Sequence, residues 1–152
     1  MALPKTLRSG DASAPRTADG APTPEKSPRP SLLIVDDSID NRALLRTFLK
    51  YTRFEVEEAD NGAVAVEMVK ARRYDFILMD LLMPEMGGFE ATRCIRQWEA
   101  SQGLKPACII ALTAWALTAE TLLSGATLHL TKPINKAKLL EVLNQQSLRA
   151  AV

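Results

Sequence analysis

The sequence predicts an α/β domain in which helices cover both faces of a parallel sheet. Short apolar runs without periodic polar residues occur at 32–35, 76–79 and 107–112. Such runs are typical of strands that are buried on both faces, as the strands of parallel sheets are. Segments with apolar residues at helical spacing alternate with these runs, and glycine or proline marks several of the boundaries. This alternation predicts parallel strands joined by helical crossovers.

Length and composition exclude several classes of protein. The 152 residues leave room for one domain, and a hydrophobic content of 47% is enough for a core. A net charge of +1 predicts no general attraction to nucleic acid or to membranes. The longest apolar stretch, 109–119, is too short to span a bilayer, and the N-terminus lacks a signal peptide's apolar segment. Cys94 and Cys108 form no metal or disulfide pattern, so we expect a cytoplasmic protein.

Residues 1–31 differ in composition from the rest of the chain. They contain six of the nine prolines, with serine, threonine, alanine and glycine between them, and five Lys/Arg against three Asp/Glu. Such a segment cannot bury enough apolar surface to offset its ordering entropy. The sequence therefore predicts a disordered tail or linker over 1–31 and a folded domain over 32–148.

The first half of the domain is expected to contain three strands and two helices. Ser38 is a suitable N-cap for the first helix, and the sequence Asp-Asn-Gly at 60–62 indicates a turn or a cap before the second. The expected elements are a strand at 32–35, a helix at 39–51, a strand at 54–59, a helix ending near 72–73, and a strand at 76–79 that ends on Asp80.

The second half is expected to continue the same alternation. Gly103 and Gly125 mark helix ends, and Asn135 can cap the last helix. The expected elements are a helix at 89–100, a strand at 107–112 ending at Thr113, a short helix at 117–124, a strand at 127–131, and a final helix whose buried face is Leu139, Leu140, Leu143 and Leu148.

Polar side chains follow four of the predicted strands. Asp36 and Asp37 follow the first strand, Asp80 ends the third, Thr113 ends the fourth and Lys132 follows the fifth. Taken singly, each of these residues has an ordinary explanation as a turn, cap or surface residue. Because the carboxyl ends of parallel strands lie at one edge of the sheet, we expect all five to converge there.

This combination favours phosphoryl-transfer chemistry. Three close carboxylates repel one another, and a hard cation such as Mg²⁺ would relieve that repulsion while leaving room for a phosphate oxygen. Lys132 and Thr113 can donate to the oxygens of a transferring phosphoryl group. One carboxylate can then act as the nucleophile and form an aspartyl phosphate. Asp80 is the best placed, because it opens a loop that proline and glycine break.

Four motifs carry a family resemblance. They are LIVDDS at 33–38, MDLLMPEMGG at 79–88, ALTA at 111–114 and LTKP at 130–133. Together they resemble the receiver domain of two-component response regulators, in the form attached to hybrid histidine kinases, over about 31–148. The resemblance implies a flavodoxin-like three-layer sandwich with strand order 2-1-3-4-5. It also implies that Asp80 accepts a phosphoryl group from the phosphohistidine of a histidine kinase or histidine phosphotransfer protein.

The resemblance further implies roles for the residues around Asp80. Thr113 and Lys132 would contact the phosphoryl oxygens, and the peptide bond before Pro133 would be cis. The implied ligands of Mg²⁺ are Asp36, Asp37, Asp80 and the backbone carbonyl of Leu82.

The chain also departs from the family pattern. Gly87 and Thr127 stand where aspartate is common, and His129 occupies the position of the switch aromatic. Only 19 residues separate Thr113 from Lys132, about three fewer than expected, which is nearly one helical turn. The fourth helix should therefore be short. This leaves standard dimerisation and standard partner docking open.

Two apolar residues, Leu82 and Trp115, flank the expected site. They are expected to limit water access to the aspartyl phosphate, although Trp115 could instead cover the loop or a partner site. The chain is expected to be a signalling receiver without an output domain rather than an enzyme. The tail could be a linker from a hybrid kinase or the native tail of a stand-alone regulator.

Two alternative hypotheses for the function are a phosphate-independent binding module and an aspartyl phosphatase. Retention of all five site residues disfavours the first. In the second class the nucleophile and the acid lie two residues apart at the first strand end, whereas Asp36 and Asp37 are adjacent.

Overall fold

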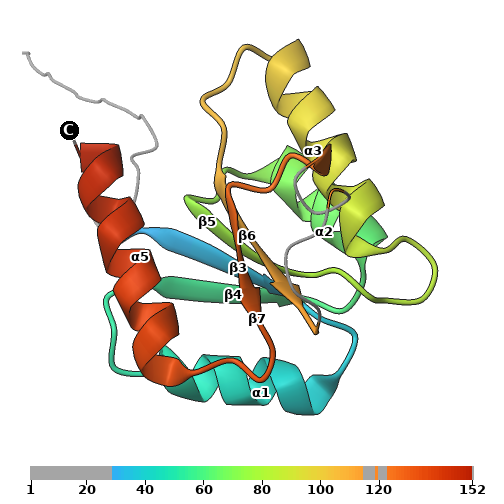
Figure 1. Cartoon of the computed structure of the whole chain (residues 1–152). Helices are drawn as coiled ribbons and strands as arrows, with labels where there is room; N and C mark the ends of the chain where they lie inside the picture. Colours follow the sequence, from blue (N-terminus) through green and yellow to red (C-terminus); the bar gives the residue numbers. More distant parts are fainter. Residues whose placement is uncertain (1–28, 115–118, 120–122, 152) are drawn as a thin grey trace, which may run out of the picture.

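The structure, a computed structural model, describes residues 29–114, 119 and 123–151. Within these residues strands and helices alternate along the chain (Figure 1). The strands are β3 (Ser31–Val35), β4 (Glu55–Ala59), β5 (Phe76–Asp80), β6 (Cys108–Thr113) and β7 (Leu128–Thr131). The helices are α1 (Ile39–Phe48), α2 (Gly62–Ala71), α3 (Gly88–Ser101) and α5 (Lys136–Ala151).

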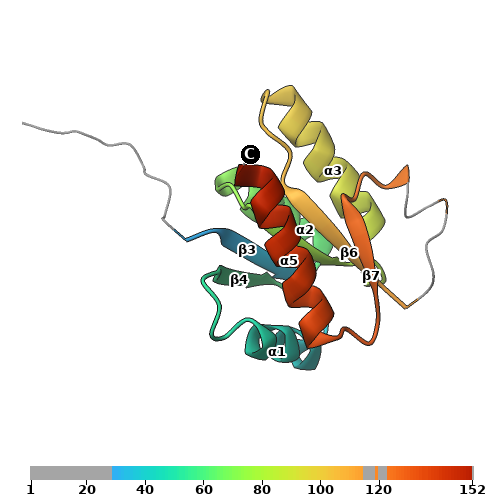
Figure 2. The same cartoon turned by 60° about the vertical axis from the view of Figure 1, so that its left-hand side comes forward.

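The five strands form one sheet in the order β4-β3-β5-β6-β7, and every neighbouring pair is parallel. In order along the chain this is 2-1-3-4-5, which confirms the predicted topology. Helices α1 and α5 cover one face of the sheet, and α2 and α3 cover the other (Figures 1 and 2). The flavodoxin-like three-layer arrangement is therefore present.

Strands β3, β5 and β6 are apolar along most of their length because both of their faces are buried. Leu33 and Val35 of β3 pack in the core on the α2 and α3 side, whereas Leu32 and Ile34 pack on the α1 and α5 side. All four are fully buried. The same alternation holds in β5 and β6, which explains why these segments lack the polar residues of a one-sided strand.

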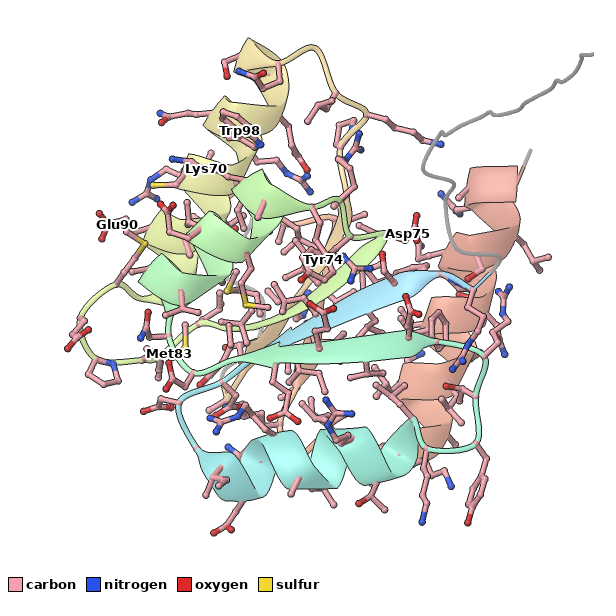
Figure 3. The ribbon with its side chains drawn as sticks, turned by 180° about the vertical axis from the view of Figure 1, so that it is seen from behind. Lys70, Tyr74, Asp75, Met83, Glu90 and Trp98 are labelled. Atoms are coloured by element: carbon pink, nitrogen blue, oxygen red, sulfur yellow. The ribbon has the colours of Figure 1, made fainter. Side chains whose placement is uncertain are left out.

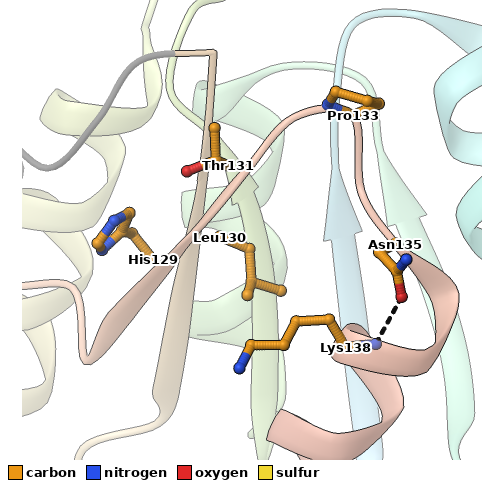
Figure 4. Close-up of a pocket in the computed structure, with 6 residues that line it drawn as sticks. All are labelled: His129, Leu130, Thr131, Pro133, Asn135 and Lys138. Atoms are coloured by element: carbon orange, nitrogen blue, oxygen red, sulfur yellow. Dashed lines mark hydrogen bonds between the residues drawn. The ribbon is translucent and has the colours of Figure 1, made fainter.

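Three helices begin with the side-chain caps that their sequences indicate. Ser38 Oγ accepts from the backbone N–H of Asn41 (3.2 Å), and Asn61 caps α2 in the same way. Asn135 Oδ1 accepts from the backbone N–H of Lys138 (2.9 Å) at the start of α5 (Figure 4). Helix α1 ends at Phe48, three residues before the predicted end at 51, and the N–H of its C-cap Leu49 donates to both Leu45 and Arg46.

The predicted buried face of the last helix is wrong at one position. Leu139 and Leu143 are fully buried, but Leu148 is 70% exposed and Val142 is buried instead. A helix turns about 100° per residue, so Leu148 lies about half a turn away from Leu139 around the axis. The i, i+3, i+4 spacing therefore selects Val142 and Leu143, and Leu148 faces away from the sheet.

Two hydrogen-bond networks tie together segments that are far apart in the sequence. The carboxylate of Asp75 accepts from the N–H of Ser31 (2.8 Å), which ties the start of β5 to the start of β3 (Figure 3). On α3, the guanidinium of Arg96 donates to the carbonyl of Gly125 (2.8 Å), to that of Ala107 (2.9 Å) and to the buried carboxylate of Glu99 (2.8 Å). Arg96 thus joins α3 to the segments that lead into β6 and β7.

The helices α2 and α3 pack side by side on their face of the sheet. The ammonium of Lys70 on α2 lies 5.7 Å from the ring centre of Trp98 on α3 (Figure 3).

Among the described residues, no helix has the length and hydropathy needed to cross a bilayer.

The ends of the predicted elements differ from the structure by a few residues. Strand β3 begins at Ser31, which is buried, and the carbonyl of Pro30 accepts from the N–H of Glu55 (2.9 Å). The prediction places both residues in the tail. The short helix predicted at 117–124 falls largely outside the described residues, so the shortened fourth helix stays a prediction. Trp115 also lies outside them.

Candidate functional site

Three carboxylates meet at the carboxyl edge of the sheet. Asp36 follows β3 and Asp80 ends β5, which is the neighbour of β3. Together with Asp37 they offer oxygen atoms that all lie within 4.8 Å of one another. Asp36 and Asp80 are 1% and 2% exposed, whereas Asp37 is open to solvent. The structure therefore brings together the three acids that the strand ends predict.

The ammonium of Lys132 lies within this group of acids. Its backbone N–H donates to the carbonyl of Thr113 (2.7 Å), which fixes the residue at the end of β7. Its Nζ lies 2.9 Å from Asp80 Oδ1 and 3.9 Å from Asp36 Oδ2. The peptide bond between Lys132 and Pro133 is cis, as the resemblance implies.

Burial and charge act in opposite directions on Asp80. Burial raises the pKa of its carboxyl group above the ordinary value, and the negative charge of Asp36 raises it further. The hydrogen bond from Lys132 and its positive charge lower that pKa, as does the backbone N–H of Leu82. An acid that loses solvent needs positive charge nearby to stay ionised. Lys132 supplies part of that charge.

The loop after Asp80 folds back tightly onto the strand. The N–H of Leu82 lies 3.3 Å from Asp80 Oδ1, and the N–H of Gly88 donates to the carbonyl of Leu81 (3.2 Å). A Cβ atom on Gly88 would lie 2.2 Å from the backbone oxygen of Asp80, so only glycine fits this contact. The side chain of Leu82 is 61% exposed at the surface.

The remaining predicted residues lie near this edge of the sheet. Thr113 is buried at the end of β6, between the strands that carry Asp80 and Lys132. His129 is half-buried on β7 and lines a shallow hollow together with Pro133 and Lys138 (Figure 4). The structure gives no contact between His129 and the acids.

One residue near the acids was missed by the sequence reasoning. The side-chain nitrogen of Asn41 lies 3.4 Å and 3.3 Å from the two carboxylate oxygens of Asp36. A usable signal was present. Asn41 falls in the first turn of a helix that begins at the end of β3, and such a turn lies beside the residues that end the strand.

The donor set fits a hard divalent cation. Asp36, Asp37 and Asp80 supply only oxygen, and the two buried acids share the ammonium of Lys132. Oxygen ligands are those that Mg²⁺ prefers, and a site with one exposed ligand leaves coordination positions for water or a phosphate oxygen. The same arrangement, with Lys132 beside Asp80, can stabilise negative charge that develops on a phosphoryl group.

Comparison with known proteins agrees with this geometry. The family model described as the response regulator receiver domain matches residues 32–144. The sensor histidine kinase GacS of Pseudomonas protegens is 38% identical over 136 residues, which cover 87% of this chain and 15% of that protein. The sensor protein GacS of Pseudomonas syringae is 41% identical over 132 residues, which cover 85% of this chain and 14% of that protein. The chain thus spans less than a sixth of these curated relatives.

Solved structures give the same result. The receiver domain of sensor histidine kinase PA1611 from Pseudomonas aeruginosa, described with a magnesium ion in its active-site cleft, has a TM-score of 0.68 and 33% identity, covering 77% of this chain and 96% of that one. The receiver domain of Ssk1 from Saccharomyces cerevisiae, crystallised with the histidine phosphotransfer protein Ypd1, has a TM-score of 0.69 and 34% identity, covering 80% of this chain and 88% of that one.

The fold and the acidic strand-end site define a doubly wound α/β domain with a candidate cation site at the carboxyl edge of its sheet. Within that class, the match over residues 32–144 is specific. The chain belongs to the response regulator receiver domain family of two-component systems.

Proposed function

We propose that this chain is a phospho-accepting receiver of a two-component system or phosphorelay. Asp80 takes a phosphoryl group from a phosphohistidine in a magnesium-dependent reaction, and the phosphorylated state alters partner binding. The observation that supports this best is that the Lys132 ammonium lies 2.9 Å from Oδ1 of Asp80. Asp80 is buried and belongs to a cluster of three acids.

The transfer uses the carboxylate of Asp80 as its nucleophile. One of its oxygens forms a bond to phosphorus while the phosphorus–nitrogen bond of the donor histidine breaks, and the bonding pair leaves with the imidazole nitrogen. Lys132 and Thr113 donate to the phosphoryl oxygens and stabilise their charge in the transition state. A bound Mg²⁺ would add positive charge at those oxygens. Its proposed ligands are Asp36, Asp37, Asp80 and the backbone carbonyl of Leu82.

The partner in this reaction is a histidine kinase or a histidine phosphotransfer protein. One of the curated relatives is a sensor histidine kinase and another is a sensor protein, and one structural neighbour was crystallised with a histidine phosphotransfer protein. We place the protein in the cytoplasm, with residues 1–31 as a tail or linker and 32–148 as the receiver domain. Its role is signalling rather than turnover of a substrate, and it contacts neither nucleic acid nor membrane directly.

Three residues are assigned to switching and water access. His129 stands on β7 beside the site and takes the place of the switch aromatic. Leu82 and Trp115 are proposed to slow hydrolysis of the aspartyl phosphate by excluding water. The double variant Leu82→Asn with Trp115→Glu should then shorten the lifetime of the phosphorylated form, and an unchanged lifetime would contradict this assignment.

Intact mass after incubation with Mg²⁺ and acetyl phosphate tests the proposal. We expect the mass of one phosphoryl group to be added, and we expect the addition to be lost in Asp80→Asn and with a chelator. Asp60→Asn is the matched control, because Asp60 also follows a strand but lies outside the acidic cluster. If no group is added and beryllofluoride with Mg²⁺ does not bind either, the chain is a phosphate-independent module.

A further inference from the structure

The N-cap and the first turn of α1 lie against Asp36, and three of their residues contact it. The backbone N–H of Ser38 donates to Asp36 Oδ1 (2.9 Å). The side-chain nitrogen of Asn41 lies 3.4 Å from Oδ1 and 3.3 Å from Oδ2. The guanidinium of Arg42 donates to the backbone carbonyl of Asp36 (2.7 Å). Asp36 is therefore held at both of its carboxylate oxygens and at its backbone carbonyl.

Among these contacts, Asn41 provides the one that a side chain makes to the carboxylate. Ser38 contributes a backbone group, and Arg42 reaches the backbone oxygen rather than the carboxylate. An amide donates hydrogen bonds without bringing a charge. Asn41 therefore orients Asp36 and leaves its negative charge available to a cation.

The position of Asn41 is itself fixed. Its backbone N–H is capped by the hydroxyl of Ser38 (3.2 Å). Helix α1 is anchored by the buried Leu45 and by the ion pair of Arg42 with Glu58 (2.9 Å). The side-chain amide is thus attached to a rigid helix. This limits the positions that it can adopt other than the one that faces Asp36.

Lys132 exerts a competing attraction on Asp36. Its ammonium lies 2.9 Å from Asp80 Oδ1 and 3.9 Å from Asp36 Oδ2. If the carboxylate of Asp36 were free to rotate, it could close this 3.9 Å gap and form a direct hydrogen bond. That rotation would turn its oxygens away from the space shared with Asp37 and draw the ammonium away from Asp80.

We propose that Asn41 is a positioning residue for the cation site. Its side-chain amide holds the Asp36 carboxylate toward Asp37 and Asp80. The ammonium of Lys132 then stays hydrogen-bonded to Asp80. The inference rests on the proposed function, because the Mg²⁺ ion and the phosphoryl group belong to that proposal. Groups that orient metal ligands in this way contribute strongly to metal affinity.

Substitution of Asn41 by alanine tests the proposal. Asn41 is exposed, so its removal loses little packing, and alanine is the better helix former. The matched control is Asn144→Ala, an exposed asparagine on α5 away from the acids. We expect Asn41→Ala to weaken Mg²⁺ binding in calorimetric titration about tenfold, and the control to stay within about twofold of the unchanged chain. Both variants should keep the thermal midpoint of the unchanged chain.

Two further readouts separate positioning from general stability. With acetyl phosphate, the Mg²⁺ concentration for half-maximal phosphorylation of Asn41→Ala should rise about tenfold, while the rate at saturating Mg²⁺ falls much less. In the unchanged chain, the side-chain amide resonances of Asn41 should shift when Mg²⁺ is added, and those of Asn144 should not.

The outcomes distinguish this inference from the proposed function. If the unchanged chain binds Mg²⁺ and is phosphorylated but Asn41→Ala binds Mg²⁺ equally well, Asn41 has no positioning role. A loss of affinity that is accompanied by a lower thermal midpoint would assign the effect to the helix and would also overturn the inference. If the unchanged chain neither binds Mg²⁺ nor accepts a phosphoryl group, the proposed function itself fails.

Discussion

The contact between Gly88 and Asp80 leads to a sharp prediction, because the neighbouring Gly87 provides its control. A Cβ atom on Gly88 would lie 2.2 Å from the backbone oxygen of Asp80 and 2.8 Å from the Cα of Leu81. A Cβ on Gly87 would lie no closer than 3.4 Å to any of its neighbours, which is ordinary contact, and its φ of −78° suits any residue. Alanine at 88 should therefore separate α3 from the end of β5, whereas alanine at 87 should not.

The size of the effect follows from these distances. Ordinary contact begins at 3.4 Å, so Gly88→Ala must move two backbone segments apart by about 1.2 Å. Overpacking of this kind costs about 1–3 kcal/mol, and loss of the hydrogen bond from Gly88 to Leu81 costs about 1 kcal/mol. We expect the free energy of unfolding to fall by about 2–4 kcal/mol, against a change within about 1 kcal/mol for Gly87→Ala.

Urea unfolding followed by far-ultraviolet circular dichroism measures both variants. The midpoint should fall clearly for Gly88→Ala at an unchanged slope, since the surface exposed on unfolding stays the same. Because the displaced atom belongs to the backbone of Asp80, phosphorylation of Gly88→Ala by acetyl phosphate should also slow. Equal midpoints for the two variants would refute the steric reasoning.

Three further predictions concern the rest of the fold. Hydrogen bonds and charge from Arg46 and Arg42 hold the pKa of Glu58 below its ordinary value of 4.5, so their stabilisation is fully present above that pH and is lost as the pH falls through the lowered pKa. Glu58→Gln should therefore be less stable than the unchanged chain at pH 7 and equal to it in strong acid, and a difference that does not change with pH would contradict this. Leu143→Ala should lower the free energy of unfolding by about 2–5 kcal/mol and Leu148→Ala by less than about 0.5 kcal/mol, as urea midpoints would show, and equal losses would contradict the exposure of Leu148. Arg96→Ala leaves the buried Glu99 without its cation and should lower the free energy of unfolding by about 3 kcal/mol, with partial recovery when Glu99→Gln is added; an unchanged thermal midpoint would contradict it.

The fold could be predicted from the sequence because three of the strands are continuous apolar runs that alternate with segments of helical periodicity. A run such as Leu32 to Val35 has no polar residue, which is typical of a strand buried on both faces. Boundaries were less accurate, because helix ends depend on local hydrogen bonds, as at Leu49, rather than on periodicity. Leucine spacing alone predicts Leu148 on the buried face, but the helical angle from Leu139 carries it to the opposite side of α5.

The site could be predicted as a set of strand ends but not as a set of contacts. Parallel topology alone brings Asp36, Asp80 and Lys132 to one edge of the sheet. The orientation of each carboxylate depends on groups that strand ends do not reveal, such as the amide of Asn41. The exclusion of any side chain at Gly88 depends on backbone distances that no sequence pattern encodes.

The charge balance of the site links the acids to the proposed chemistry. Two buried carboxylates, Asp36 and Asp80, share the ammonium of Lys132, and the exposed carboxylate of Asp37 lies within 4.8 Å of both. Burial raises the pKa of Asp80, although a nucleophile must be ionised to attack. A second positive charge would lower that pKa and prepare Asp80 for attack. A phosphoryl group on Asp80 adds further negative charge, so the phosphorylated chain should bind Mg²⁺ more tightly than the free chain. By linkage, Mg²⁺ should stabilise the phosphorylated state to the same extent.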